Sequence, residues 1–474
     1  MKERSTTAYI GFILVLSCLP YLNTLNGAFL LDEMFNIVKN PYIRSLDINL
    51  LKNSFFNSEV YGAVFKGEIY RPLYIIIYAV EYKLWWLNVV GYHAVSLLLN
   101  AINSAAVYFL LNLLLNKKNI SFFGALLFAL LPVHTENVSG IKEQTSLLSA
   151  FFFFLTLTCY LKYRKSNSNK YLAASLILFA PSLLSRETAA ALPLIIALID
   201  ILLFADIKIS RVKRYLPWAL FFMELFAFLW LRTSVLGQVA QQNYYLGDSL
   251  KATMFTMLRG VAYYIKLLLF PINLCGDYGS YPISYILDAR VAASAILLLS
   301  ILAVGLLLIR KRPLIAFGVL FFYVMLLPVS NIIPTVNIIA ERFLYTPAFG
   351  PILVVTVLVR DSKNISKSIL YPFLATVIIL FSIIIFNRNI VWSGQYAFWY
   401  DVIKKMPGSS GAHYQLALNM TDAQKRIEEL KTALSLKPAE KWAVLIISAL
   451  ASTYAGTGDY ASASEYYSYL LKYR

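Results

Sequence analysis

The sequence predicts an all-helical protein that crosses a membrane many times. The chain of 474 residues is 59% hydrophobic and only 14% charged, whereas a soluble domain carries about a quarter charged residues. Apolar stretches long enough to cross a hydrocarbon core of roughly 30 Å recur along most of the chain. The net charge of +17 comes mainly from short basic segments between these stretches. These three observations together indicate a polytopic helical fold.

We expect about eleven membrane-spanning helices. The first, at 7–30, follows basic residues and is interpreted as uncleaved, because no small-residue cleavage site is clear. The others are expected at 89–115, 120–134, 145–161, 171–185, 188–205, 215–235, 290–309, 313–330, 343–359 and 368–386. The apolar stretch 249–274 is expected to lie along the outer interface, because counting it as a span would put a basic turn on the wrong side.

Basic residues set the expected orientation. The segments predicted to be cytoplasmic are the N-terminus (Lys2, Arg4), "NKKN", "KYRKSNSNK", "KISRVKR", "RKR" and "RDSKNISK". Their basic excess is typical of cytoplasmic loops, so it argues against a nucleic-acid partner. The basic N-terminus is therefore expected in the cytoplasm, and an odd number of spans then places the C-terminal domain outside. The membrane is expected to be the inner (cytoplasmic) membrane. The three scattered cysteines and three histidines indicate no disulfide framework or metal site.

The chain divides into a membrane domain and a small tail. The membrane domain is expected at 1–386, with a first outer loop at 31–88 and an outer interfacial segment at 236–289. A connector at 387–406 leads to a helical domain at 407–474. In "LASTYAGTGDYASASEYYSYLL" the spacing of Tyr454, Ala463 and Tyr467 fits the two antiparallel helices of a tetratricopeptide repeat. An ordinary helical hairpin is the alternative interpretation.

Asp32 and Glu33 follow directly after the first apolar stretch. Acids often flank a span because a carboxylate at the bilayer centre costs roughly 2.5–3.5 kcal/mol, and Asp32 could also cap the helix that follows. The sharper hypothesis makes Asp32 a general base at the boundary of water and lipid. There it can meet a polar acceptor from outside and a lipid-borne donor from within the bilayer.

Polar residues also collect in other outer-facing segments, so that with the Asp32–Glu33 pair at least five segments converge on one face. They are Tyr70, Arg71, His134, Glu136, Lys142, Glu143, Arg186, Glu187, Asn331, Glu341, Arg342 and Tyr345. Each could be satisfied by neighbours at the interface, but the inner loops have nothing of this variety. A face that gathers acids and arginines suits a lipid substrate that carries phosphate, because arginine binds phosphate bidentately and stays charged.

Several motifs then show a resemblance that covers nearly the whole chain in order. They are "LDEMFNIVKNPYI", "YRPLYIIIYAVEY", "ALLFALLPVHTENVSGIKEQTSLLS", "SRETAAALPLIIALID" and "NIIPTVNIIAERFLYTP". The sequence resembles the membrane-embedded C-type glycosyltransferases (the GT-C fold). More closely, it resembles the transmembrane and tetratricopeptide-repeat O-mannosyltransferase family and its bacterial relatives.

This resemblance implies transfer of mannose or a similar sugar from a polyprenyl-phosphate donor to a protein or glycan hydroxyl outside the membrane. It makes Asp32 the base, with Glu33 as its neighbour and helper, and it assigns Arg342 to the donor phosphate. Arg71, Arg186 and Tyr345 are further candidates for the phosphate, and His134, Glu136, Lys142, Glu187 and Glu341 for lining the site. A single displacement of this kind inverts the anomeric centre. It requires no divalent metal, although an acidic pair is compatible with one.

The sequence departs from the family pattern at three places. Leu31 stands where relatives often carry a further acid, Leu131 stands where histidine is common, and "GIKEQTS" differs from the commoner run. These departures bear on the acceptor and on mannose as the sugar. Two other functions therefore stay open: a ligase that moves a whole lipid-linked glycan, and a non-catalytic transporter or assembly factor whose tail binds a protein partner.

Overall fold

The computed structural model describes residues 5–61, 69–205, 211–237, 245–335, 337–362 and 366–471. The basic residues Lys2, Arg4, Lys208 and Lys363, part of the basic segments discussed above, lie outside these ranges. All regular elements of the described ranges are helices, which confirms the predicted all-helical class. In chain order they are α1 (Thr6–Cys18), α2 (Ile48–Phe56), α3 (Pro72–Trp85), α4 (Val89–Leu115), α5 (Lys118–Ala129), α6 (Thr135–Ser139), α7 (Gln144–Ser166), α8 (Asn169–Ser185), α9 (Leu192–Leu203), α10 (Arg211–Leu236), α11 (Leu250–Leu269), α12 (Ala289–Leu307), α13 (Pro313–Leu326), α14 (Phe349–Asp361), α15 (Lys367–Val391), α16 (Gln395–Lys405), α17 (Ser410–Leu418), α18 (Ala423–Ser435), α19 (Glu440–Gly456) and α20 (Tyr460–Leu471).

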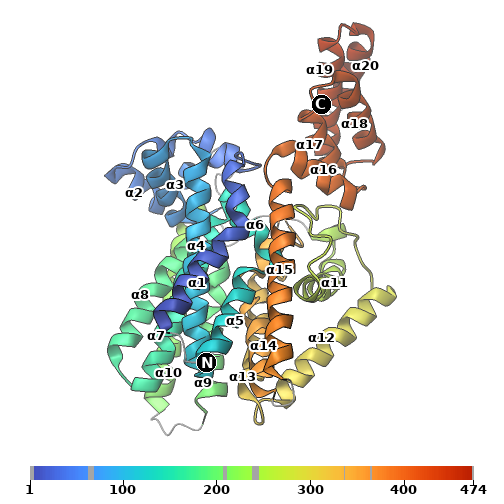
Figure 1. Ribbon diagram of the computed structural model, residues 1–474. Helices are drawn as coiled ribbons and strands as arrows, with labels where there is room; N and C mark the ends of the chain where they lie inside the picture. The colour runs from blue at the N-terminus through green and yellow to red at the C-terminus, as the bar shows by residue number, and fades with distance from the viewer. Residues whose placement is uncertain are drawn as a thin grey trace.

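The long apolar helices form one bundle (Figure 1). Within the described ranges, six helices are long and apolar enough to cross a membrane, or up to seven if the bent pair at Lys118–Ala129 and Pro132–Ser139 is one span. A helix lies at each of the eleven expected positions, but several are too short to pass that test. The number of spans is therefore not confirmed, while the multi-pass character is.

Small residues let the bundle helices approach closely, as is common between apolar helices. A Cβ built on Gly350 of α14 would lie 2.4 Å from the carbonyl oxygen of Gly318 in α13. The turns that carry basic residues are equally tight, because Asn116 and Asn167 end α4 and α7 in the left-handed conformation, with φ of 51° at both. Asparagine tolerates this conformation better than most residues.

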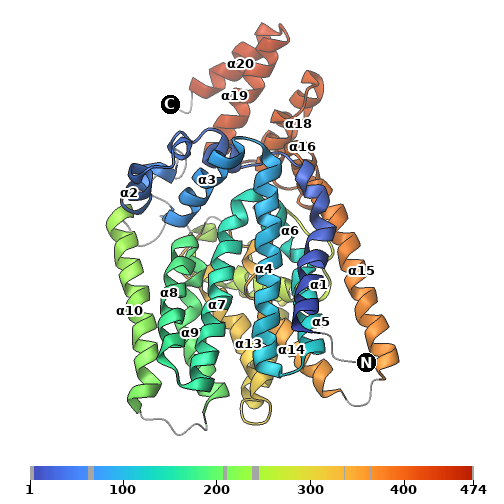
Figure 2. The same cartoon turned by 60° about the vertical axis from the view of Figure 1, so that its left-hand side comes forward.

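Helix α11 lies across the direction of the long helices, as Figures 1 and 2 both show. It is not among the helices that are apolar and long enough to span. Its orientation agrees with the expectation for 249–274, and its position at an interface stays a prediction.

The first outer loop and the tail lie at the same end of the bundle (Figure 2). Helices α2 and α3 cover that end, and α16–α20 project beyond it, while α1 begins toward the other end. The tail consists of two successive helical hairpins, α17–α18 and α19–α20, around a small core of Ala417, Ile427, Leu430, Ala433, Ile446 and Leu450.

Candidate active site at the loop-covered end of the bundle

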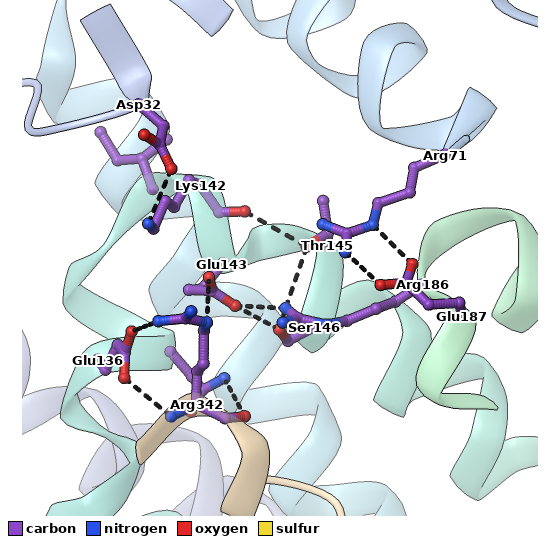
Figure 3. A network of polar contacts seen from close by, with 12 residues as sticks. Asp32, Arg71, Glu136, Lys142, Glu143, Thr145, Ser146, Arg186, Glu187 and Arg342 are labelled. Carbon is purple, nitrogen blue, oxygen red and sulfur yellow. Dashed lines mark hydrogen bonds and ion pairs between the residues drawn. The ribbon is translucent and has the colours of Figure 1, made fainter. Parts of the chain in front are cut away.

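The turn that carries the acidic pair sends its two carboxylates in different directions. Leu31 has φ of 51°, a left-handed conformation that is uncommon for leucine. After it, Asp32 points outward: its side chain is 43% exposed, and its Oδ2 accepts a hydrogen bond of 3.0 Å from Lys142 Nζ. Asp32 is thus the accessible acid of the pair, held by a cation from another loop (Figure 3).

Glu33 is buried, unlike its neighbour. Its carboxylate accepts the backbone N–H of Leu30 at 2.7 Å and the backbone N–H of Lys142 at 3.0 Å. Burial raises the pKa of Glu33 to about 7, against the opposing effect of these N–H groups. Glu33 therefore ties the Asp32 turn to the Lys142 loop, which brings Lys142 to Asp32.

Arg342 lies in a short helical turn, Glu341–Leu344, between α13 and α14. Its Nη1 contacts Glu136 Oε1 at 2.5 Å, its backbone N–H donates to Glu136 Oε2 at 2.9 Å, and its Nε lies 3.5 Å from Glu143. Burial opposes the charge, but the carboxylates of Glu136 and Glu143 raise the pKa of Arg342 above its usual range, and Asp32 contributes to the same field. Asp32 and Arg342 thus lie on one side of the molecule and interact electrostatically.

Arg186 joins the same network from the junction of α8 and α9. Its Nη1 is bonded to both Glu143 and Ser146 (Figure 3). Glu143 therefore lies between two guanidinium groups, Arg186 and Arg342.

A narrow cavity opens beside these two arginines. It is lined by Ser146, Arg186, Thr188, Met325, Val329, Arg342, Phe343, Tyr345, Thr346 and Pro347. Its wall thus combines cationic and hydroxyl groups with apolar side chains. The chemistry of this wall matches a phosphoryl group attached to an apolar chain, while the cavity of about 20 Å³ has room for about one water molecule in this conformation.

Arg71 and Glu187 form a second pair near the mouth of the site. Arg71 Nε and Nη2 donate to the two oxygens of Glu187 at 2.9 and 2.5 Å. Burial would raise the pKa of Glu187, but the paired guanidinium of Arg71 outweighs this effect and holds the pKa well below its usual range. This bidentate pair joins the start of α3 to the turn before α9.

The site as a whole pairs each cation with an acid. The cations Arg71, Lys142, Arg186 and Arg342 contact the acids Asp32, Glu136, Glu143 and Glu187. The two arginines beside the cavity are more buried than Asp32, with exposed side-chain fractions of 6% for Arg186 and 11% for Arg342. The accessible acid therefore lies toward solvent and the recessed cations lie below it.

His134 and Tyr345 back this network from inside the bundle. The Tyr345 hydroxyl donates to Asn100 at 2.9 Å and accepts from Asn103 at 3.2 Å. The His134 ring packs against the rings of Phe128 and Tyr345, with centroids 4.8 and 4.5 Å apart. Both side chains are buried, and of the two only Tyr345 lines the cavity.

Sequence reasoning missed several residues of this region. Ser146, Thr188 and Thr346 line the cavity. Each lies inside one of the quoted motifs, and for Thr188 and Thr346 the available signal was a hydroxyl residue shortly after Arg186 and Arg342. Glu341 is buried, and its Oε1 accepts from the Tyr278 hydroxyl at 2.7 Å, facing away from the Arg342 network. Among the described residues, no group of three His, Cys, Asp or Glu side chains could hold a metal ion.

The fold and the site define a multi-pass helical membrane protein with a charged site at one end of its helical bundle. Residues 72–231 match the family described as dolichyl-phosphate-mannose-protein mannosyltransferase. The chain is 27% identical over 439 residues to a protein O-mannosyl-transferase of Caenorhabditis elegans, covering 89% of this chain and 61% of that one. It is 24% identical over 481 residues to human protein O-mannosyl-transferase TMTC1, covering 89% of this chain and 54% of that one.

These similarities confirm the resemblance to the transmembrane and tetratricopeptide-repeat O-mannosyltransferases. The chain spans only 61% and 54% of the length of these two relatives. Among solved structures it is similar to the apo oligosaccharyltransferase of Archaeoglobus fulgidus, with a TM-score of 0.44 and 11% identity, covering 92% of this chain and 60% of that one.

Proposed function

We propose that the chain transfers mannose or a similar sugar from a polyprenyl-phosphate lipid to a hydroxyl group of a protein or glycan at the outer face of the membrane. The observation that carries this proposal is the joint position of Asp32, at the mouth, and the cavity between Arg186 and Arg342. The names of the relatives supply the reaction class. Glycosyl transfer needs both a proton acceptor and a group that stabilises the leaving phosphate.

The two recessed arginines are assigned to the donor phosphate. Among the described residues, the contacts of Arg186 use Nη1, and the polar side-chain contacts of Arg342 use Nη1 and Nε. Nη2 of each guanidinium is thus a remaining donor for a phosphate oxygen. As the bond from the anomeric carbon to the phosphate oxygen breaks, the electron pair stays on the phosphate, where these cations stabilise it.

Asp32 is assigned to the acceptor. Its carboxylate takes the proton of the attacking hydroxyl as the new bond to the anomeric carbon forms on the face opposite the phosphate, so the configuration inverts. Lys142 holds the carboxylate until the acceptor arrives. Glu33 is not the base in this scheme, because it is buried away from the acceptor and its oxygens hold the turn through two backbone N–H groups.

The proposed location follows from the common end of the site and the tail. The first outer loop and α16–α20 lie at one end of the bundle (Figures 1 and 2). With the basic turns in the cytoplasm, the tail is an extracytoplasmic, tetratricopeptide-like platform for an acceptor or partner protein, on an inner-membrane enzyme. A tag at the C-terminus should then react with an impermeant reagent in intact cells, and protection of that tag would overturn this orientation.

The test is transfer by purified protein in lipid nanodiscs, with a panel of polyprenyl-phosphate sugars and a peptide acceptor. Wild type should release the polyprenyl phosphate and form an inverted product, and Asp32→Asn should not. A transporter would keep moving lipid without product, and a ligase would use only a lipid-linked oligosaccharide. Either result would replace the proposed reaction.

A further inference from the structure

A second buried charged cluster lies under the junction of the membrane domain and the tail. Its centre is Glu341, which directly precedes Arg342 in the chain. Glu341 Oε1 accepts from the Tyr278 hydroxyl at 2.7 Å and from the Cys275 backbone N–H at 2.5 Å, whereas Oε2 is buried without a hydrogen-bond partner in the described part of the chain. An unpaired buried carboxylate oxygen is costly, so a nearby cation has to compensate for it.

That cation is Arg388, near the end of α15. It is 5% exposed, and its Nη1 forms an ion pair of 2.5 Å with Asp401 of α16. Its Nε and Nη2 are buried without hydrogen-bond partners among the described residues. Burial raises the pKa of Glu341 to about 7, and Arg388 is the strongest of the charges that oppose this shift. Among the described residues Arg388 contacts Asp401, and its charge acts on Glu341 only at longer range.

Helix α16 is also tied to the segment that holds Glu341. Lys405 Nζ contacts Asp401 at 2.6 Å and donates to the Leu274 carbonyl at 2.5 Å. In the same segment, a Cβ on Gly276 would lie 2.2 Å from the ring of Phe398, so the helix and the segment 274–278 touch without space between them. Because Glu341 accepts from Cys275 and Tyr278, these contacts form a continuous chain from Asp401 and Lys405 of α16 through 274–278 to Glu341.

We propose that Asp401 is a positioning residue, which acts through Lys405, the segment 274–278 and Glu341 to hold Arg342 against the donor phosphate. The first helix after the membrane domain is then a structural part of the donor site. When α16 moves, the segment 274–278 moves with it and shifts Glu341, and the backbone of Arg342 follows its neighbour. This inference rests on the proposed function and extends it, because it makes donor binding depend on the tail.

The kinetic test compares two ion pairs of equal length. Asp401→Asn removes the partner of Arg388, whereas Glu429→Gln breaks the 2.5 Å pair of His413 and Glu429 between α17 and α18. We expect Asp401→Asn to raise the donor KM about fivefold or more, the lower end of coupling between sites. The acceptor KM should not change, because Asp32 lies outside the cluster, and Asp401→Glu should restore much of the donor KM.

A merely structural role gives a different result. If Asp401 only stabilised the fold, Asp401→Asn and Glu429→Gln would both lower the amount of active protein. The maximal rate would then fall for both variants, and the donor KM would not change. Equal behaviour of the two variants would overturn the proposal.

The coupling can also be measured without the reaction. In a double-mutant cycle on thermal unfolding, Asp401→Asn and Glu341→Gln should be non-additive, because one chain of contacts through Lys405 and 274–278 joins the two residues. Glu429→Gln and Glu341→Gln should add. Additive losses of Tm for the first pair would refute the coupling, whereas a wild type that transfers no sugar would refute the proposed function, so the two failures are distinguishable.

Discussion

Replacing Asp32 with asparagine keeps the size of the side chain and removes its ability to accept a proton. The ion pair that the change breaks is partly exposed, with 43% of the Asp32 side chain and 17% of the Lys142 side chain accessible. Such pairs contribute about 0–1 kcal/mol to stability. Asp32→Asn should therefore insert, purify and unfold almost as wild type does.

The effect on the reaction should be much larger. One positioned base contributes about 10²- to 10⁴-fold to a rate, which corresponds to roughly 2.7–5.5 kcal/mol in the activation free energy. The assay is the initial rate of transfer from a polyprenyl-phosphate sugar, with Tm measured on the same preparation. The matched control is Glu33→Gln, one residue away, where the buried carboxylate accepts two backbone N–H groups.

The pair of variants separates chemistry from structure. Asp32→Asn should lose rate and keep Tm, whereas Glu33→Gln should lose Tm and, per folded molecule, keep much of its rate. If Asp32→Asn retained more than about a tenth of the wild-type rate, well above the loss expected for a general base, Asp32 would not be that base.

Three further predictions concern other parts of the site and the tail junction. Arg342→Ala should lower kcat/KM for the donor about 10²- to 10³-fold, and Arg342→Lys should recover only part because it lacks the planar fork; equal activity of both variants and wild type would contradict the assignment. The pKa of Glu33 is raised from 4.5 to about 7, so its contribution to stability is complete below pH 4.5 and is lost as pH rises through about 7. This amounts to about 3 kcal/mol, and Tm measured against pH should fall less for Glu33→Gln than for wild type over that interval. Gly276→Ala would put a Cβ 2.2 Å from the Phe398 ring and should lower Tm, since overpacking costs about 1–3 kcal/mol. An unchanged Tm would show that the ring and the segment can move apart without loss of stability.

Hydrophobicity made the architecture predictable, because apolar length is the main requirement for a helix in a bilayer. The order of the expected spans also predicted that Asp32, Arg186 and Arg342 lie at one end of the bundle, because successive spans alternate in direction. The positions of the helices agree with the expected spans. The number of helices that cross the whole membrane was not predictable, because helices such as α9 and α13 are short.

Other features of the site could not be found in the sequence. The opposite directions of Asp32 and Glu33 depend on a left-handed turn at Leu31, and leucine gives no signal for that conformation. The burial of His134 and Tyr345 depends on packing between helices distant in sequence. The chain of contacts from Asp401 to Glu341 was missed for the same reason, because it joins segments that are far apart in the sequence.

The balance of charges in the site determines where the protein must stabilise negative charge during sugar transfer. As a phosphodiester the donor carries one negative charge, and its product carries a second one, while Asp32 loses its own charge by taking a proton. The reaction thus moves one unit of negative charge from a wet rim to a dry interior and leaves the total unchanged. The inner guanidinium groups must therefore stabilise the added negative charge, so Arg342→Ala should lower kcat more than Arg71→Ala. If Arg71→Ala lost more kcat than Arg342→Ala in the same assay, the charge would not move inward.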